Sequence, residues 1–473
     1  MFNDLREYLN FLRGHNLLVE IDDEVSLDLE LAHILREVCY NNGPAVIFKN
    51  VKDCLTKVVG NLFGSLDRID NILSEDEISR RLEYFSNILK TRYRGIQDIV
   101  KTISEFGKVG KALPRKVGSG PVHEVEWKNI DITKLPAIRQ WPGEKARFFT
   151  MGITFVAYDD RINFGYYRLQ VVDERRMIMH WMPWRKSREI AEMWSDEVPV
   201  AIVFGTDPIT MLMASVPIPS PLDKVFITGL LRGRGIDFVE GKSVKNVVYP
   251  ANSELVIEGV VKLRDLVPEG PFGDHVGVYS PVLKYPIVEV RAIFSRDDPI
   301  IPVTVTGKPI LEDGYMMIFG ERVVKNLLKC IASEIVDLHI PPSGLGYVYI
   351  VSIRKKYPGQ AKRVMMLLWS LVPVLGKIVI VVDSDVNVRD LNQVMYMIAA
   401  HVDPQRDIVI IPRYPTEELD PSTPIVGYGS KVGIDATRKL PEEYGGEKYP
   451  EDVKPDEETM KKISNIISKI LKR

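Results

Sequence analysis

Over the first hundred residues, helical and strand patterns alternate. Apolar residues recur at helical spacing over 2–12 and again over 27–40, whereas 45–48 is a short apolar run of strand type. Ser74 is followed by Glu-Asp-Glu, the chemistry of a capping box, and predicts the start of another helix. The pattern therefore predicts an N-terminal α/β domain over 1–107.

The centre of the chain changes to short β-branched or aromatic runs that are separated by turn residues. Strands are predicted over 122–127, 152–158, 166–172, 178–181, 198–204, 209–214, 255–261 and 286–294. Many short strands at such spacing predict a barrel or a sandwich. Helices are predicted to interrupt them over 188–194 and 223–233. This central domain should cover 121–305, after a linker rich in Lys, Gly and Pro over 108–120.

Beyond residue 306 the helical and strand patterns alternate again. Helices are predicted over 315–334, 361–371 and 391–400, and strands over 347–353, 377–382 and 407–411. Such alternation predicts an α/β domain over 306–450 with a partly parallel sheet. A polar stretch then leads to a helix over 456–473 with an apolar stripe. Either the chain's own core or a neighbouring subunit must cover that stripe, and we favour the subunit.

Composition and charge narrow the class of protein. The 473 residues include 62 Lys and Arg and 64 Asp and Glu, a net charge of −2, which argues against a nucleic-acid binder. A hydrophobic content of 45% argues against a disordered chain. Three cysteines without a CxxC pair exclude a disulfide scaffold and a thiolate zinc site. Because no stretch reaches the ~18 apolar residues of a spanning helix, we expect a cytoplasmic protein without an integral membrane segment.

The stretch from Asn163 to Lys186 combines polar and aromatic side chains. Asn163 and Arg168 flank one turn and strand, and His180, Arg185 and Lys186 follow one hairpin later. A hairpin brings its two ends together, so an amide, a guanidinium, an imidazole and further cations should converge. A basic surface hairpin is the alternative, but the interleaved Tyr and Trp residues suit a flat aromatic cofactor with an anionic tail.

A second candidate stretch, VPEGPFGDHVGVY, covers 267–279. Glu269 and Asp274 lie five residues apart in a loop that prolines stiffen and that can approach a ligand closely at its glycines. Beside an arginine, one carboxyl can stay ionised and paired while the other is protonated by desolvation and donates. A surface turn with two solvated acids is the alternative and carries about equal weight.

Motifs that are spread in order along the whole chain resemble the UbiD family of decarboxylases, which use prenylated FMN. They are LREYLNFLRGHNLLVEID, NFGYYR, ASVPIP, ITGLLRG, YPANSELVIEG, PEGPFGDHVG, AKRVMM and GSKVGIDAT. The resemblance implies an N-terminal α/β region, a central split β-barrel that binds the flavin, and a C-terminal α/β domain whose last helix protrudes to a partner subunit. It also implies reversible decarboxylation of an α,β-unsaturated or aromatic acid by the cofactor.

The resemblance assigns roles to single residues. Arg168 matches the arginine that holds the substrate carboxylate, Glu269 the glutamate paired with it, and Asp274 the acid that protonates carbon after CO2 leaves. Asn163 matches an amide ligand of a divalent metal such as Mn2+, and His180 falls where some members have a metal-binding histidine. The positions that match the flavin site are Tyr166, Tyr167, Arg168, His180, Trp181, Met182, Arg185, Lys186, Ser215, Val216 and Lys224.

Lys224 departs from the family pattern, because the metal-binding glutamate of the family falls on it. A charged lysine cannot bind a divalent cation. Either Asp223 serves as the ligand instead, or the Lys224 ammonium replaces the metal charge beside the flavin phosphate; we prefer the second. His401 likewise stands where we expect an arginine near a monovalent-ion site. We therefore predict flavin binding with little or no need for a divalent metal.

Two hypotheses of function follow. The set Arg168, Glu269 and Asp274 favours a decarboxylase in which Asp274, its pKa raised by a dry site, delivers the proton. The lysine at position 224 favours a non-catalytic UbiD-like subunit of a larger carboxylase. Candidate substrates are trans-anhydromevalonate 5-phosphate of isoprenoid biosynthesis, slightly favoured by a thermophile-like composition, and 3-polyprenyl-4-hydroxybenzoate of quinone biosynthesis. Expected partners are a flavin prenyltransferase that supplies the cofactor and further copies of this chain, as a dimer or hexamer.

Overall fold

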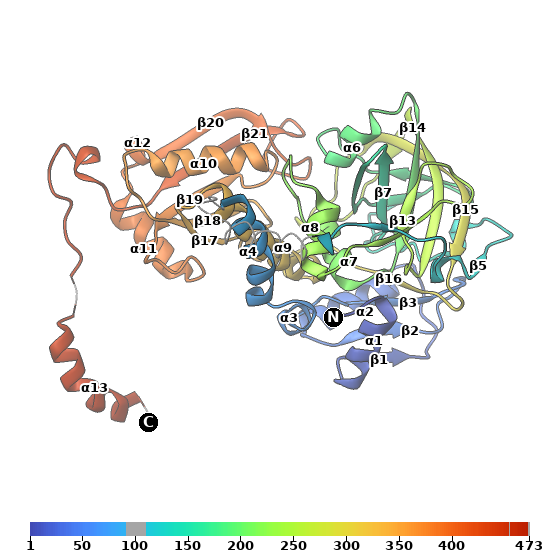
Figure 1. Ribbon diagram of the computed structural model, residues 1–473, viewed down its shortest axis with the longest axis horizontal. Coiled ribbons are helices and arrows are strands. Elements are labelled where there is room, and N and C mark those ends of the chain that lie inside the picture. Colours follow the sequence, from blue (N-terminus) through green and yellow to red (C-terminus); the bar gives the residue numbers. More distant parts are fainter. Residues whose placement is uncertain (91–109, 454, 472–473) are drawn as a thin grey trace, which may run out of the picture.

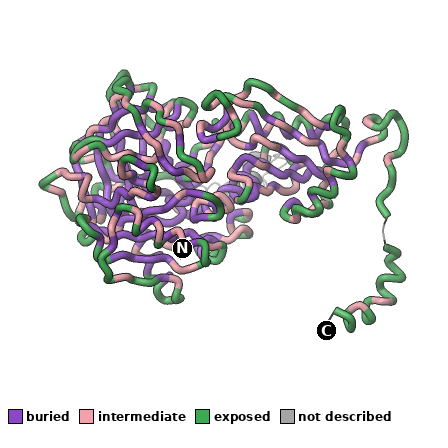
Figure 2. The backbone as a smooth tube through the Cα atoms, turned by 180° about the vertical axis from the view of Figure 1, so that it is seen from behind, coloured by how far each residue is buried: buried purple, intermediate pink, exposed green. Residues whose placement is uncertain are grey.

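The computed structural model describes residues 1–90, 110–453 and 455–471 and shows a mixed α/β fold built on four sheets. In Figure 1 the N-terminal region lies below the central sheet, the C-terminal sheet lies beside them, and the last helix stands apart. Buried residues run through the sheets and the inner helices, whereas the last helix is exposed along most of its length (Figure 2). This architecture confirms the predicted α/β class.

The N-terminal region is built on a four-stranded sheet in the order β1-β2-β3-β16. β1 (Leu18–Ile21) pairs in parallel with β2 (Ala45–Phe48), and β2 pairs antiparallel with β3 (Lys57–Gly60). β3 pairs in parallel with β16 (Ile300–Val303), which follows the central strands in the sequence. The helices of this region are α1 (Leu5–Gly14), α2 (Glu30–Tyr40), α3 (Leu66–Ile72) and α4 (Glu75–Lys90).

The helix starts in this region follow from local chemistry. The Asp4 carboxylate accepts a hydrogen bond from the Glu7 amide at 2.8 Å, and the Ser74 hydroxyl accepts one from the Glu77 amide at 3.3 Å. These N-cap contacts satisfy donors that the first turn leaves free. Apolar residues at helical spacing then bury one face of α1, namely Leu5, Tyr8, Leu9 and Leu12. The predicted helices and the predicted strand of this region are confirmed.

Nine strands form the central sheet, in the order β6-β9-β10-β15-β14-β11-β7-β8 with β5 paired to β15. They are β5 (Val125–Glu126), β6 (Phe148–Phe149), β7 (Ile153–Tyr158), β8 (Arg161–Tyr166), β9 (Leu169–Val171), β10 (Arg176–Met179), β11 (Glu197–Phe204), β14 (Leu255–Glu269) and β15 (Leu283–Ser295). Among the described residues the end strands β6 and β8 do not pair with each other, so the sheet is not a closed barrel. The split barrel stays a prediction.

One predicted strand of the central region is a helix. The run 209–214 lies in α7 (Pro208–Ser215), whose N-cap Asp207 accepts a hydrogen bond from the Thr210 amide at 3.0 Å. All residues of α7 except the last are buried, so the apolar run has no polar face and no helical period to read. Two further helices, α6 (Lys186–Ala191) and α8 (Lys224–Arg232), agree with the prediction in position.

A small sheet of three strands, β13-β12-β4, joins the predicted linker to the central region. β4 (Arg115–Lys116) pairs in parallel with β12 (Asp237–Glu240), which pairs antiparallel with β13 (Val248–Pro250). The described part of the predicted linker, from residue 110 onward, therefore includes a short strand; residues 108 and 109 lie outside the described part of the chain.

The C-terminal region has a five-stranded sheet in the order β17-β18-β19-β21-β20. Its strands are β17 (Ile335–His339), β18 (Val348–Ile353), β19 (Ile378–Asp383), β20 (Ile408–Pro415) and β21 (Tyr428–Asp435). The pairs β18–β19 and β19–β21 are parallel and the outer two are antiparallel, which confirms the partly parallel sheet. Its helices are α9 (Glu312–Ile331), α10 (Gln360–Leu371), α11 (Leu391–His401) and α12 (Pro404–Asp407).

The last helix, α13 (Glu457–Leu471), packs against no other part of the described chain. No residue of α13 is buried, and Ile466 and Leu471 are 58% and 79% exposed. The predicted terminal helix is therefore confirmed, and its role in oligomerisation stays a prediction. No helix among the described residues is long and apolar enough to span a bilayer.

Candidate active site

Arg168 lies in the short connection between strands β8 and β9 of the central sheet. β8 ends at Tyr166 and β9 begins at Leu169, so Arg168 falls between two strands. Its carbonyl still accepts a hydrogen bond from the His180 amide at 3.1 Å, which continues the β9–β10 ladder by one residue. The predicted hairpin thus brings Arg168 beside His180. The Arg168 side chain is 7% exposed.

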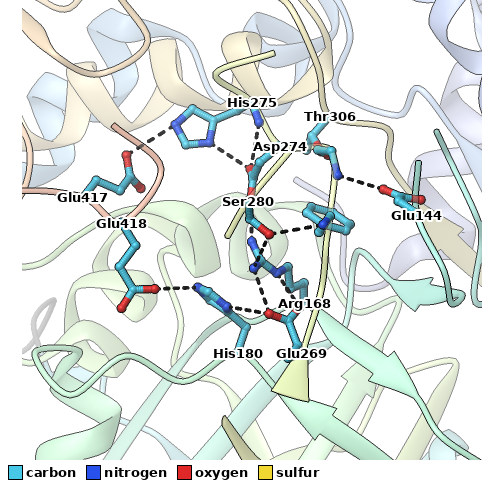
Figure 3. A network of polar contacts seen from close by, with 12 residues as sticks. Glu144, Arg168, His180, Glu269, Asp274, His275, Ser280, Thr306, Glu417 and Glu418 are labelled. Carbon is cyan, nitrogen blue, oxygen red and sulfur yellow. Dashed lines mark hydrogen bonds and ion pairs between the residues drawn. The ribbon is translucent and has the colours of Figure 1, made fainter. Parts of the chain in front are cut away.

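Two carboxylates and a hydroxyl hold the Arg168 guanidinium (Figure 3). Nε and Nη2 form a bidentate pair with Glu269 at 2.8 and 2.9 Å, and Nη1 lies 2.7 Å from Asp274 Oδ2. Nη2 also donates to Ser280 Oγ at 3.1 Å, and the Phe272 ring centroid lies 4.8 Å from Cζ. Four of the five N–H donors of an arginine are therefore used inside the chain.

The bidentate partner of Arg168 is Glu269, the last residue of β14, and its side chain is fully buried. The resemblance implied that Arg168 holds a substrate carboxylate through its planar fork. In this structure Glu269 occupies that fork, and the N–H that is left belongs to Nη1, which faces Asp274. A substrate carboxylate must therefore approach Arg168 from the side of Asp274.

Arginine and histidine neighbours set the protonation of both carboxyl groups. Burial raises the pKa of Glu269, but Arg168 and His180 outweigh it and lower that pKa to about 2. Burial also raises the pKa of Asp274, but His275 and Arg168 bring it well below its usual range. Both groups are therefore carboxylates at neutral pH. The predicted raised pKa of Asp274 is wrong for this structure, because neighbouring cations more than offset the desolvation.

His275 bridges Asp274 to a glutamate of the C-terminal region (Figure 3). Its Nδ1 lies 3.0 Å from Asp274 Oδ1, and its Nε2 lies 3.5 Å from Oε2 of Glu417, two residues after β20. Burial lowers the pKa of His275, but Glu417 and Asp274 outweigh it and raise that pKa well above its usual value. The imidazole is therefore protonated at neutral pH.

His180 lies on the other side of the same cluster. Its Nδ1 is 3.2 Å from Glu269 Oε2, and its Nε2 is 3.7 Å from Oε2 of Glu418, which also accepts a hydrogen bond from the Tyr285 hydroxyl. Burial and the charge of Arg168 lower the pKa of His180. His180 is thus a neutral imidazole between two acids.

These groups line a cavity of about 200 Å3, which we call the acid cavity. Its walls include Arg168, His180, Met182, Asp274, His275 and Glu417. A second cavity of about 320 Å3, the cation cavity, is lined by Asn163, Arg185, Lys186, Ser215, Val216 and Lys224, among others. Tyr166, Tyr167 and Arg185 line both cavities, so the two are neighbours.

The cation cavity has an excess of positive charge, with Arg185, Lys186 and Lys224 against one acid, Glu189, among its lining residues. Lys224, the first residue of α8, is 8% exposed, and its Nζ lies 5.4 Å from the Phe164 ring centroid. Burial, together with the charges of Arg185 and Lys186, lowers the pKa of Lys224 to about 7. Among the described residues, none of the three cations forms an ion pair. An anionic group such as a phosphate therefore fits this cavity.

A divalent metal does not fit the residues that are present. The expected ligands Asn163 and His180 line different cavities, and the Lys224 ammonium lies in the cavity of Asn163. Asp223 is exposed and caps α8 by accepting a hydrogen bond from the Phe226 amide at 2.7 Å. Across the part of the chain that is described, no three His, Cys, Asp or Glu side chains are grouped to hold a metal. The Asn163–His180 metal pair is therefore not supported.

Most of the residues predicted to line a flavin do line one of the two cavities, and Trp181 is the exception. Trp181 is buried behind the wall, where its Nε1 donates to Ser187 Oγ at 2.9 Å. Ser187 also contacts the Tyr167 hydroxyl, so Trp181 supports a lining residue instead of lining the cavity.

Four site residues were missed by reasoning from the sequence: Ser280, His275, Glu417 and Glu418. His275 carried a signal, because it follows Asp274 directly in the loop. The glutamates carried none, since they lie in another sheet region and reach the site only through the fold.

Comparison with family models defines the class of this protein as a carboxy-lyase. Three family models cover most of the chain: the N-terminal, Rift-related and C-terminal domains of 3-octaprenyl-4-hydroxybenzoate carboxy-lyase match residues 9–85, 115–309 and 314–436. The chain therefore belongs to the UbiD family of decarboxylases.

Similar proteins agree with this assignment. An uncharacterized protein of Aeropyrum pernix is 38% identical over 97% of each chain. Vanillic acid decarboxylase of Sedimentibacter hydroxybenzoicus, in its closed form, has a TM-score of 0.86 at 27% identity and covers 100% of both chains. The UbiD-class enzyme HmfF of Pelotomaculum thermopropionicum, in complex with FMN, has a TM-score of 0.74 at 25% identity over 96% of this chain and 98% of its own.

Proposed function

We propose that this chain decarboxylates an α,β-unsaturated or aromatic carboxylic acid with prenylated FMN. The observation that carries the proposal is the contact between the two cavities. One offers three cations that form no ion pair among the described residues, and the other offers Arg168 with two carboxylates. Their common wall, Tyr166 and Tyr167, would lie along a flat ring that joins a phosphate in the first cavity to a carboxylate in the second.

In this proposal the chain's cations hold the cofactor. Lys224, Arg185 and Lys186 face the phosphate and regain the anionic partner that the apo chain lacks. Prenylated FMN, when bound, supplies the electron sink for breaking the carbon–carboxylate bond. The Lys224 ammonium takes the place of a divalent metal charge, so metal is not needed for flavin binding.

The paired carboxylates orient the acid. Arg168 stays fixed by Glu269, so its Nη1 presents a charged donor in a set direction. A substrate carboxylate takes up this donor and competes with Asp274, which must then turn away from Arg168. Asp274 in its new position returns a proton to carbon after CO2 leaves. The buried surroundings keep water out of the step.

A third cavity of about 160 Å3 supports an acid with an uncharged body. It shares Ser215 with the cation cavity and His275 with the acid cavity, so the body of a bound acid would extend into it. Of the described residues that line it, the charged ones are Asp313, Glu321 and His275. A phosphorylated acid such as trans-anhydromevalonate 5-phosphate would bring its phosphate near two acids. The aromatic class that includes 4-hydroxybenzoates suits this lining better.

The test is turnover by protein that is co-produced with a flavin prenyltransferase. We expect a bound flavin chromophore, no stoichiometric manganese, and CO2 release from aromatic or unsaturated acids in a panel that includes both candidate substrates. Lys224→Glu should raise the metal content and serves as the control for metal analysis. A colourless protein that also fails to bind the cofactor in titration would contradict the proposal. A loaded protein that turns over no acid would support the alternative, a non-catalytic subunit.

A further inference from the structure

The loop after β20 brings Glu417 from the C-terminal region into a site that is otherwise built by the central region. Glu417 is 7% exposed, and its Oε2 lies 3.5 Å from His275 Nε2. The same loop places Glu418 against His180, so two acids of one region meet two histidines of another (Figure 3). Contacts of this kind exist only while the two regions lie against each other.

His275 is held at both ring nitrogens. Nδ1 lies 3.0 Å from Asp274 Oδ1 and Nε2 lies 3.5 Å from Glu417 Oε2, and a carboxylate can only accept. A proton on each nitrogen makes both contacts favourable, as a hydrogen bond at Nδ1 and as a longer ion pair at Nε2. The charged and titratable groups around the pair are Asp274, Asp313, Glu417, Arg168, Arg185 and Tyr347.

The proton that the site needs is thus on His275 and not on Asp274. Asp274 faces two cations and stays ionised, whereas His275 faces three acids: Asp274, Glu417 and Asp313. A carboxylate cannot donate, so Asp274 first has to receive a proton. His275 Nδ1 is the charged donor beside it.

We infer that His275 is the residue that stores the proton for Asp274, and that Glu417 of the C-terminal region keeps it charged. The inference rests on the proposed function. When CO2 leaves, the bonding pair that the electron sink takes up has to return to the substrate carbon together with a proton. The proton moves from His275 Nδ1 to Asp274 Oδ1 and from Asp274 to that carbon, which forms the C–H bond. His275 is left neutral and regains a proton from water. Because Glu417 comes from the C-terminal region, separation of that region from the central region would remove the charge that keeps His275 protonated.

Histidine side-chain NMR of the apo chain tests the pair without any turnover. His275→Gln identifies the His275 signal among the seven histidines. We expect this signal to titrate above the usual histidine range in the unchanged chain and at least about one pH unit lower in Glu417→Gln, the scale of an opposite charge at this distance. Glu417→Asp keeps the charge and should restore part of the shift.

The matched control is Glu418→Gln, in the same loop, whose carboxylate faces His180 and Tyr285. It should leave the His275 titration in place. An unshifted His275 signal in Glu417→Gln, or equal shifts in Glu417→Gln and Glu418→Gln, would overturn the role of Glu417.

In the loaded enzyme, His275→Gln should lower kcat by about 10-fold or more and remove its fall at high pH, where the imidazolium is lost. Glu417→Gln should move that fall to lower pH by the shift seen in NMR. A basic limb that does not move while the NMR titration does would overturn the proton store, although the pair itself would stand. Loss of all turnover in the unchanged chain would refute the proposed function and leave the NMR result intact.

Discussion

The two neighbouring cavities treat buried charge in opposite ways. In the acid cavity Arg168 meets Glu269 and Asp274 within 2.9 Å, and each carboxylate has a second cationic or imidazole neighbour. In the cation cavity Lys224 is as deeply buried but has two further cations beside it instead of an acid. Burial is the same in both places, and the neighbours differ.

This difference in neighbours indicates which buried charges stabilise the fold and which ones serve ligand binding. Buried ions that are paired inside the chain are stable in the apo protein, and removing one partner leaves the other uncompensated. Buried ions of one sign are unfavourable until a ligand of the opposite sign binds. The acid cavity is therefore complete without a ligand, whereas the cation cavity requires an anion. Variants of the acid cavity should therefore lower the stability of the apo chain. Variants of the cation cavity should lower FMN affinity without lowering that stability.

Arg168→Met should have the largest effect. It leaves Glu269 and Asp274 buried without their arginine, and we expect a loss of about 3–5 kcal/mol in the free energy of unfolding at neutral pH. The loss should shrink as the pH falls and the two carboxyls become protonated. Thermal and denaturant unfolding of the apo chain at pH 7 and pH 4 would measure it. A variant as stable as the unchanged chain would show that the pairing has no structural role.

Lys224→Met should act in the opposite direction on the apo chain. It removes a buried cation without a partner, so the unfolding midpoint should stay or rise, while FMN affinity falls about 10- to 100-fold through loss of a charge-assisted contact to the phosphate. Lys186→Met is the matched control: its ammonium already donates to the Leu222 carbonyl, and we expect a smaller loss. Titration of FMN fluorescence would decide. A destabilised apo chain with unchanged FMN affinity would show that Lys224 has a structural role like that of Arg168, and would contradict the difference between the two cavities.

FMN binding should be linked to the protonation of Lys224. The pKa of Lys224 is lowered to about 7 in the apo chain, and a bound anion raises it again. Above pH 7 binding must therefore take up a proton, up to about one per FMN, and affinity should fall by up to about tenfold per pH unit. Calorimetry at pH 8 in two buffers of different ionisation enthalpy measures the uptake. Equal uptake by Lys224→Met would assign it to another group.

Ser280→Ala should have the smallest effect. Ser280 Oγ accepts hydrogen bonds from Arg168 Nη2 and from the Phe272 amide, each at 3.1 Å. Their loss should lower the free energy of unfolding by about 1 kcal/mol and leave FMN affinity unchanged, because Ser280 contacts Arg168 and does not line the cation cavity. Unfolding and FMN titration of one preparation give both results. A change in FMN affinity would show that the two cavities are coupled.

Most of the elements were predictable, and the exceptions have local causes. Amphipathic helices such as α1 and α10 follow from apolar spacing, and β18 and β19 from short buried runs. The helix α7 was misread as a strand because it is buried on all sides, which removes the period that distinguishes the two. The predicted strand over 166–172 is interrupted at Arg168, where the side chain is needed at the site.

The candidate site was predictable where its residues lie close in sequence. Asn163 to Lys186 form neighbouring hairpin ends, so tyrosines and cations were expected to converge, and they do. The metal pair stays a prediction that the geometry does not support, because a hairpin distributes side chains to two faces and Asn163 and His180 line different cavities. The sequence showed which side chains lie close to one another. It did not show which of the two cavities each side chain lines.

The sequence by itself determined the family, most of the helices and strands, and the charged residues of the site, including the lysine at position 224. These depend on residue types and on their spacing along the chain. The tertiary structure alone decided which charges meet. Glu417 reaches His275, and β16 joins the N-terminal sheet, across long stretches of chain. The protonation of Asp274 follows the same rule: its pKa depends on the nearby charges of His275 and Arg168, and packing against the C-terminal region adds Glu417, which acts on His275.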